Sequence, residues 1–469
     1  MRSRHKALAI GLTVLGALWL GPILQVSATP DTMATDPATT GRFGVAARVY
    51  TLEQCMRLAE LHYPKIAEAL AALKKKQAER DEVAYLPFGE FKARAALGPA
   101  PTVRGTSVYS QNTDAALTDN MGLFWRLGVE GVVPLWTFGK LENALDALDA
   151  QVEVGRHDLT KAKNDLKVDV RRAFYGLQLA RDASLLVRQA ADRLDDYIEG
   201  MKESVAEGEG DDIELVKTQM YRAELDARAS QARQEAANAL ASLRFLTGAV
   251  GSFDIPDEPL TRVEHALAPL PHYLAAASIH RPEVNMARAG MIARRAQVRL
   301  AESRFYPDVG LGLSASWSAA PEVTDQTNPF VKDQGNFLSY GAALVLEWKL
   351  DFLPSTARLT KAHAELEAMR ATQRYALGGV GLEVEKAYHE AAEAGARLDA
   401  FDRAADYAKK WLIKVQQGID IGMFEEDELV EPAKEYAFKQ FARMSAVYDY
   451  NIALAKLAQA TGWRGMLTP

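Results

Sequence analysis

The chain has 469 residues, a quarter of them charged, a formal net charge of −7 and one cysteine. A net negative charge argues against a nucleic-acid partner, because the phosphate backbone attracts basic faces. Cys55 cannot form an intrachain disulfide, and its helical spacing predicts a small buried side chain instead. The length alone favours two or three domains.

The N-terminus is typical of a secretory signal peptide, predicted over residues 1–28. Three basic residues precede an apolar run from Ala7 to Leu24, and small residues end it at Ala28. An uncleaved anchor is the alternative. Beyond Ala28 no stretch approaches eighteen apolar residues, so a mature chain that crosses a membrane would need a closed β-barrel. Residues 29–49 lack periodicity and are predicted to form a flexible lead-in.

The rest of the chain is an internal duplication. With a shift of 214, "VDVRRAF" at 168–174 matches "LEVEKAY" at 382–388, and Thr-Gly at 247–248 matches Thr-Gly at 461–462. Small changes of this shift upstream are what loop insertions produce. The sequence therefore predicts two repeats, 50–256 and 257–463, followed by a C-terminal tail at 464–469.

Each repeat has the same predicted order of elements. A helix begins at a proline, Pro64 or Pro282, and leads into a strand, a loop, a second strand and a very long helix. An acidic turn with a glycine follows, and then a shorter return helix. The long helices are predicted within the proline-free stretches 140–207 and 355–431, and the return helices over 211–247 and 427–461. Each long helix would measure about 100 Å at 1.5 Å per residue, and the short helices would stack end to end with the return helices.

Four segments alternate between apolar and small or polar residues. They are "GEFKARAAL" (89–97), "LFWRLGVEGVVPL" (123–135), "DVGLGLSASWS" (308–318) and "FLSYGAALVLEWKLD" (337–351). One such segment alone would favour a half-buried soluble sheet. Four, with aromatic residues near their ends, favour strands in lipid, with the loops 98–120 and 318–336 outside the membrane. Four strands are too few to close a barrel, so the chain must oligomerise.

At this point the sequence resembles the TolC-like outer-membrane efflux protein family, the outer membrane factors of tripartite efflux and type I secretion systems. The resemblance covers about residues 50–463. It rests on the duplication, on "TLEQCMRLAELHYPKIAEALAAL" followed by "YLP", on "VPLWTFGK" between strand and long helix, and on the glycine-containing acidic turns.

The resemblance implies an α+β membrane protein with a tandem-repeat TolC-like fold. Four β-strands per chain would contribute to a trimeric, 12-stranded outer-membrane β-barrel, continued by a long α-helical coiled-coil tunnel across the periplasm. It implies a passive exit duct in contact with outer-membrane lipid. The implied partners are a periplasmic adaptor (membrane fusion) protein and an inner-membrane pump of RND, ABC or MFS type. The pump supplies the energy, so no catalytic site, cofactor or metal is expected.

The resemblance also implies site residues in the turn "IDIGMFEEDELVEP" (419–432). Carboxylates that ring the periplasmic aperture fall on Glu428 and Glu431, and the first repeat offers Glu214 at the position that matches Glu428. Glu428 and Glu431 are predicted to share one helix face. The alternative is that these acidic residues only complement a helix N-terminus. The turns expected to dock the adaptor contain Gly208, Gly422, Phe424, Leu215 and Leu429.

Two other classes of protein remain to be weighed. An enzyme is disfavoured, because the histidines are scattered and no H-E-x-x-H or G-x-S-x-G pattern occurs. A periplasmic coiled-coil scaffold without channel activity explains the helices and the signal peptide but leaves the paired alternating strands unexplained. Transported substrate, pump and adaptor identity, and the trigger for opening cannot be deduced from the sequence.

Overall fold

The computed structural model describes residues 48–103, 115–208, 211–320, 323, 333 and 335–463. The predicted signal peptide, the lead-in up to residue 47, parts of both connecting loops and the C-terminal tail lie outside the described residues. The helices are α1 (Leu52–His62), α2 (Pro64–Ala84), α3 (Lys140–Ala206), α4 (Asp212–Thr247), α5 (Leu270–His280), α6 (Pro282–Ser303), α7 (Phe352–Asp420) and α8 (Val430–Ala460). The strands are β1 (Arg48–Val49), β2 (Glu90–Val103), β3 (Ala115–Trp136), β4 (Phe253–Asp254), β5 (Asp308–Ala319) and β6 (Phe337–Glu347).

Prolines and caps set where the helices begin. Pro64 and Pro282 occupy the first positions of α2 and α6, where a missing N–H costs nothing. Thr51 and Gln54 form a capping box at the start of α1, since the Thr51 side chain accepts from the Gln54 N–H and the Gln54 side chain accepts from the Thr51 N–H. The predicted proline starts are therefore confirmed.

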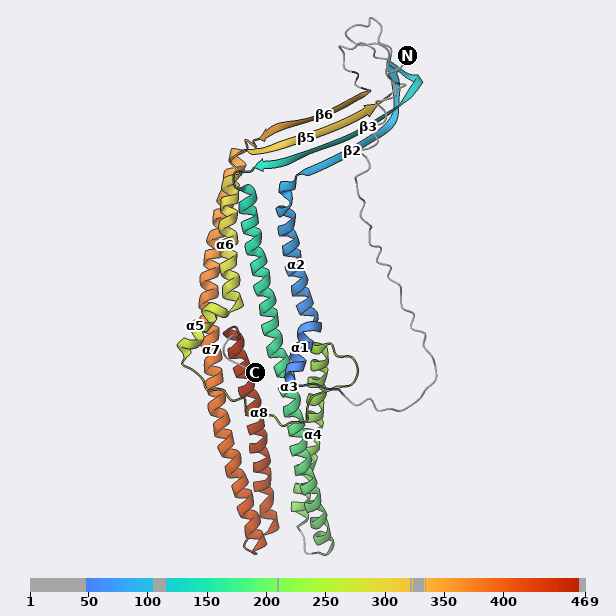
Figure 1. Cartoon of the computed structure of the whole chain (residues 1–469). Helices are drawn as coiled ribbons and strands as arrows, with labels where there is room; N and C mark the ends of the chain where they lie inside the picture. The colour runs from blue at the N-terminus through green and yellow to red at the C-terminus, as the bar shows by residue number, and fades with distance from the viewer. Residues whose placement is uncertain are drawn as a thin grey trace. The chain divides into compact units, whose positions relative to one another are not determined.

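The two long helices dominate each repeat. α3 has 67 residues and α7 has 69, which at 1.5 Å per residue corresponds to about 100 Å each. α4 runs back along α3, and α8 runs back along α7 (Figure 1). None of the helices in the described part of the chain is both long enough and apolar enough to cross a membrane.

The four long strands form one antiparallel sheet at the end of the long helices where α3 and α7 begin (Figure 1). Its order is β2-β3-β5-β6, so the pairing of β3 with β5 joins the two repeats. The strands β2 and β6 are its two edges.

The first connecting loop is shorter than predicted. The sequence places it at 98–120, yet β2 extends to Val103 and β3 begins at Ala115. Pro99 and Pro101 lie inside β2, paired with Leu123 and Met121. A strand at the edge of a sheet tolerates them, because only one of its two sides must supply ladder N–H groups and residues two apart share a side.

Each return helix ends against the start of a short helix, as the end-to-end stacking predicts. A side chain on Gly248, which ends α4, would lie 2.7 Å from the Cβ of His62, and one on Gly462 would lie 2.5 Å from the carbonyl oxygen of His280. Both glycines have positive φ values, +64° and +83°. The same contact therefore closes both repeats, and only glycine fits it without strain.

Two hydrophobic clusters lie at these closures, one for each repeat. The first contains Cys55, at 0% exposure, as predicted for this residue. Burial raises the pKa of the Cys55 thiol to about 11. The second cluster centres on Tyr450, Leu454 and Leu457 of α8.

The segment between Asp254 and Leu270 ties the repeats together. Its first half binds α3, where the Leu260 N–H donates to the Asp182 carboxylate at 2.9 Å. Its second half binds α8, where the buried Asn451 amide accepts from the Val263 N–H at 2.9 Å and donates to the Thr261 carbonyl at 2.8 Å. Arg262 forms an ion pair with Asp399 of α7 at 2.7 Å.

The repeat closure yields a first prediction. Gly462→Ala should lower the melting temperature of the purified protein more than Gly208→Ala. Both changes force a non-glycine residue into a left-handed conformation, at about 1–2 kcal/mol. Gly462→Ala alone adds a steric overlap, which costs about 1–3 kcal/mol, since nothing lies within 4 Å of a side chain placed on Gly208. Equal shifts in circular dichroism melts would contradict the role of the His280 contact.

Candidate functional site

The first hairpin turn, between α3 and α4, is acidic. Gly208 has a φ of +81°, a left-handed conformation that lets the chain reverse direction after α3. The Asp211 carboxylate accepts from the Ile213 N–H at 2.9 Å and caps α4. Glu214 forms an ion pair with Lys217 at 3.0 Å. Leu215 is 8% exposed and lies inside the hairpin, and its part in adaptor docking stays a prediction.

The second hairpin turn, between α7 and α8, is apolar at its tip. Gly422 has a φ of +73°, and its N–H donates to the Ile419 carbonyl at 2.9 Å. The ring of Phe424 lies so close to Gly418 that a side chain there would come within 2.2 Å of it. Phe424 remains 38% exposed, beside the exposed Met423.

The predicted common helix for Glu428 and Glu431 is wrong. Glu428 belongs to the 3-10 turn η2 (Glu426–Leu429), whereas Glu431 is the second residue of α8. Pro432 gives the reason, because a proline has no N–H for the carbonyl four residues earlier and its ring clashes with that carbonyl. That carbonyl belongs to Glu428, so α8 cannot extend back to 427 as predicted. Both glutamates are exposed, and Leu429 between them is half-buried.

The two hairpins touch across the repeats through side chains of α4 and α8. Lys434 forms an ion pair with Glu431 at 3.0 Å and lies 5.0 Å from the ring centre of Tyr221. Arg228 lies 5.2 Å from the ring centre of Phe438. Contacts of this kind are worth about 0.5–1 kcal/mol at exposed sites.

Electrostatic effects agree with this proximity. The hydrogen bond to Glu431 raises the pKa of Lys434. The hydrogen bond and charge of Glu214 raise the pKa of Lys217, and the charge of Glu431 adds to that effect from the other hairpin. The three predicted aperture carboxylates thus lie at the hairpin end of the long helices. Two of them, Glu214 and Glu431, form ion pairs with lysines.

The sequence reasoning missed the contact between Tyr221 and Lys434. The only signal for it is their position, since Tyr221 lies thirteen residues after Gly208 and Lys434 twelve after Gly422. Residues at equal heights on adjacent return helices can meet. Deducing the contact also requires knowing that α4 and α8 are neighbours, which the sequence does not specify.

The sheet has one apolar and one polar face. Directly paired residues share a face. One face is apolar, with Leu127, Val129, Leu313, Ala315, Tyr340 and Ala342 among its members, and the other contains Glu90, Lys92, Arg94, Arg126, Glu130, Ser314, Ser316, Ser318 and Ser339. Lys92 and Arg94 of the first strand are paired with Glu90 and Glu130 at 3.2 and 2.7 Å.

Aromatic side chains mark both ends of the sheet. The end next to the helices carries exposed Tyr85, Phe88, Trp136, Tyr306, Trp348 and Phe352. Towards the other end the Trp125 and Trp317 rings meet at 4.3 Å. Eleven residues separate Trp125 from Trp136, which is about 26 Å perpendicular to a membrane for strands tilted by roughly 45°. An apolar band of about 25 Å between two aromatic girdles is what a lipid-facing sheet requires.

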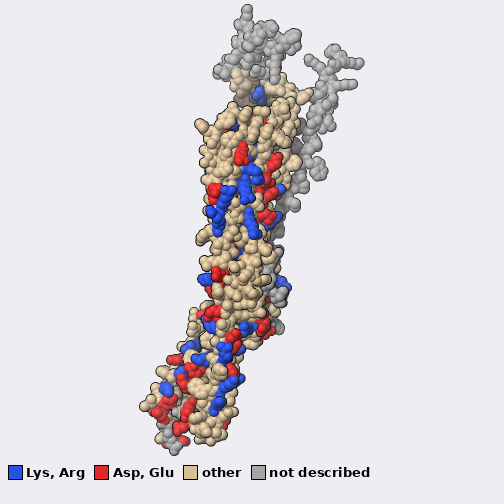
Figure 2. Space-filling view, turned by 90° about the vertical axis from the view of Figure 1, so that its left-hand side faces the viewer, with Lys and Arg blue, Asp and Glu red and all other residues tan. Residues whose placement is uncertain are grey.

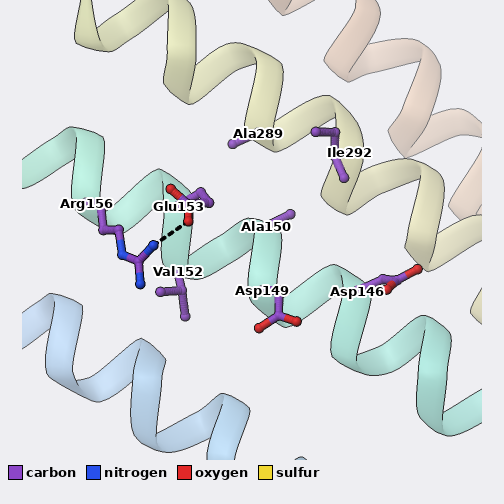
Figure 3. Close-up of a pocket in the computed structure, with 8 residues that line it drawn as sticks. All are labelled: Asp146, Asp149, Ala150, Val152, Glu153, Arg156, Ala289 and Ile292. Atoms are coloured by element: carbon purple, nitrogen blue, oxygen red, sulfur yellow. Dashed lines mark hydrogen bonds and ion pairs between the residues drawn. The ribbon is translucent and has the colours of Figure 1, made fainter.

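The distribution of charged side chains agrees with an apolar band on the sheet. In Figure 2 they are sparse near the sheet and crowded at the hairpin end of the described chain. A groove between α3 and α6 also gathers carboxylates, shown in Figure 3. Each has a cationic partner, Asp146 with Arg299, Asp149 with Arg80, and Glu153 with Arg156. The first two pairs connect α3 to α6 and to α2, so we interpret the groove as a helix contact.

Comparisons with known proteins agree with this geometry. A family model described as "Outer membrane efflux protein" matches residues 56–249 and 274–463. Protein CyaE of Bordetella pertussis is 26% identical over 440 residues, covering 85% of this chain and 83% of that protein. Among solved structures, the open state of the MtrE outer membrane channel of Neisseria gonorrhoeae has a TM-score of 0.71 at 16% identity and covers 88% of both chains. A membrane protein from Pseudomonas aeruginosa has a TM-score of 0.73 at 17% identity, covering 88% of this chain and 92% of that one.

The hairpin contact yields the second prediction. Lys434→Met should speed amide hydrogen exchange about fivefold in the first turns of both α4 and α8, because it removes about 1 kcal/mol that couples them. Mass spectrometry of peptic fragments measures this. Lys439→Met is the matched control, since Lys439 pairs with Glu435 within α8 at 3.1 Å and its loss should leave α4 unchanged. Unchanged exchange in α4 of the Lys434 variant would disprove the coupling.

Proposed function

Because the chain belongs to the outer membrane efflux protein family, we propose that three copies form a passive exit duct through the outer membrane and periplasm. The observation that carries this proposal is the pair of unlike faces on the sheet, one apolar between aromatic girdles and one polar. Three copies supply twelve strands, with β6 of one copy beside β2 of the next. The apolar face then contacts outer-membrane lipid, and the polar face lines a water-filled lumen.

The helix contact between the two repeats of one chain suggests how neighbouring copies pack, because the duplication gives each helix a counterpart in the other repeat. Within one chain, α3 packs against α6 and α8 of the other repeat. The counterpart of α3 is α7, whose corresponding flank carries exposed Leu353, Tyr375 and Leu382. The counterparts of α6 and α8 are α2 and α4, near which Leu61, Phe245 and Val250 are exposed. A head-to-tail contact between these two flanks repeats the internal joint and closes a ring.

The hairpin turns would form the periplasmic end of this duct. Exposed Glu428 and Glu431 supply negative charge at the aperture, and Glu214 adds to it from the first repeat. The exposed carboxylates of three copies would favour cations at this constriction. The contact of Lys434 with Tyr221 would hold the two hairpins of one copy together while the aperture is narrow.

The same turns would bind the partners of the duct. Phe424 and Leu429 offer an apolar contact to a periplasmic adaptor, with Gly208 and Gly422 shaping the backbone reversals. An inner-membrane pump would supply the energy, which fits a chain whose candidate site is built for conduction rather than for catalysis. The apolar side chains of Phe424 and Leu429 suit a partner that packs an apolar hairpin of its own against them.

The third prediction tests assembly. Leu382→Glu should convert the trimer into smaller species in detergent, because it places a charge in an apolar helix contact. Native mass spectrometry would measure the number of copies. Glu393→Ala, also on α7 but at an exposed ion-paired position, should leave the trimer intact. A Leu382→Glu trimer as stable as the unmodified protein would exclude this flank as the interface.

The fourth prediction tests the aperture. In planar bilayers, Glu428→Gln/Glu431→Gln should lower the cation-to-anion permeability ratio by about twofold or more, since it removes the fixed negative charge there. Asp212→Asn removes one carboxylate at the start of α4 and should change the ratio much less. An unchanged ratio in the double variant would reduce these glutamates to a solvated helix start. No conductance from folded protein would favour the periplasmic scaffold.

A further inference from the structure

One cation on the polar face of the sheet differs from its neighbours. Arg126 lies in β3, paired across the sheet with Ala96 of β2 and Ser318 of β5. Lys92 and Arg94 on the same face have carboxylate partners, as described above. Arg126 has none within the part of the chain that the structure describes. It lies ten residues before Trp136, at the level where β5 and β6 end while β2 and β3 continue away from the helices.

Two aromatic rings hold the Arg126 guanidinium in place. Its central carbon lies 5.5 Å from the ring centre of Phe124 and 5.4 Å from that of Phe337. Both phenylalanines share its face, because Phe124 is two residues away in β3 and Phe337 is paired with Ser318. A cation–π contact is not a hydrogen bond, so it leaves the N–H groups of the guanidinium available as donors.

A buried hydroxyl lies beside this arginine. Ser318 is 1% exposed, and its Oγ has no hydrogen-bond partner within the described residues. A buried polar atom without a partner is costly, at about 1–3 kcal/mol, and therefore demands an explanation. Ser318 is directly paired with both Arg126 and Phe337, so the hydroxyl, the cation and one ring lie next to each other.

We propose that Arg126 and Ser318 form a binding site for an anionic group, a carboxylate or a phosphate, on the lumen-facing side of the sheet near the outer mouth. This rests on the proposed function, which makes the polar face the lumen. Arginine N–H groups bind the oxygens of such anions in bidentate geometry, and the serine hydroxyl donates a further hydrogen bond. Three copies would place three such sites around the exit.

The charge of this site is opposite to that of the proposed periplasmic aperture. Cargo that bears both charges, such as an amphoteric molecule, would meet carboxylates at entry and a cation at exit. The phenylalanines remove part of the water around the guanidinium, and an ionic hydrogen bond is stronger where water is partly excluded. The lipid-facing side, where Trp125 and Trp317 meet, lies across the sheet from this site, so the phosphates of lipid head groups are not its expected source of anions.

The experiment is block of single-channel current by inorganic phosphate added on the outer side of a planar bilayer. The expected result is a reversible block of the unmodified protein that weakens about tenfold or more in Arg126→Gln. Ser318→Ala should weaken it less, since one neutral hydrogen bond is lost. The matched control is Arg94→Gln/Glu130→Gln, which removes a neutral ion pair from the same face and should leave the block unchanged.

The outcomes are separable. Equal block in the unmodified protein and Arg126→Gln would overturn the site and leave Arg126 as a packing residue between two rings. Open-channel currents without any phosphate block would overturn the site while the duct stands. The absence of currents from the unmodified protein would instead contradict the proposed function. Block restored by Arg126→Lys only in part would support bidentate binding, and full restoration would contradict that geometry.

Discussion

The free edges of the sheet are the constraint on which the rest of the molecule depends. β2 and β6 each have one side without a neighbouring strand in the chain. Within lipid, unpaired backbone N–H and C=O groups cost several kcal/mol each, because no water is present to bind them. In the proposed trimer, a second copy therefore covers the part of each edge that lies within lipid. The helices continue directly from the strands, so the closure of the sheet also determines which helices become neighbours below it.

In the proposed trimer, the duplication turns this constraint into a ring with two kinds of joint. Inside one chain the joint is reinforced covalently and by polar contacts: the segment between Asp254 and Leu270 binds α3 and α8, and Trp463 lies 4.6 Å from the guanidinium of Arg171. Between copies the corresponding place on α7 contains Gly378, Gly379 and Gly381, with open space around each. Glycine in a helix costs about 1 kcal/mol relative to alanine. The joint between copies is thus built from a more pliable helix than the joint within a chain.

Much of the architecture follows from local chemistry and could be predicted. The prolines at 64 and 282, the uninterrupted helical stretches after Lys140 and Ser355, and the strict alternation in the four strands are all local signals. The errors occur where proline acts in context. Pro99 and Pro101 favour a loop in isolation, but an edge strand accepts them. Pro432 follows an acidic run that suits a helix start, yet its ring delays α8 until Val430.

The site could be predicted only in part, because its contacts are distant in sequence. The turn glycines and the exposure of Glu428 and Glu431 follow from a short stretch of residues. The contact of Lys434 with Tyr221 joins residues more than 200 positions apart, and the burial of Leu215 arises only when the hairpin has formed. Arg126 belongs to a pattern of alternation that was visible, but its rings come from two strands, and Ser318 from a third.

The unlike chemistry of the two hairpin turns has a consequence for stoichiometry. Both turns are acidic, with Asp211 and Asp212 in the first and Glu425 and Glu428 in the second, but only the second exposes the apolar side chains of Met423 and Phe424 beside its glycine. The proposed trimer therefore presents six turns at one end, in two alternating kinds. A partner with a single type of binding surface finds three equivalent places there, whereas a ring of six identical partner subunits must use two different binding modes. The duplication gives the backbone of this assembly nearly six-fold rotational symmetry, and the differences in side chains between the repeats reduce that symmetry to three-fold.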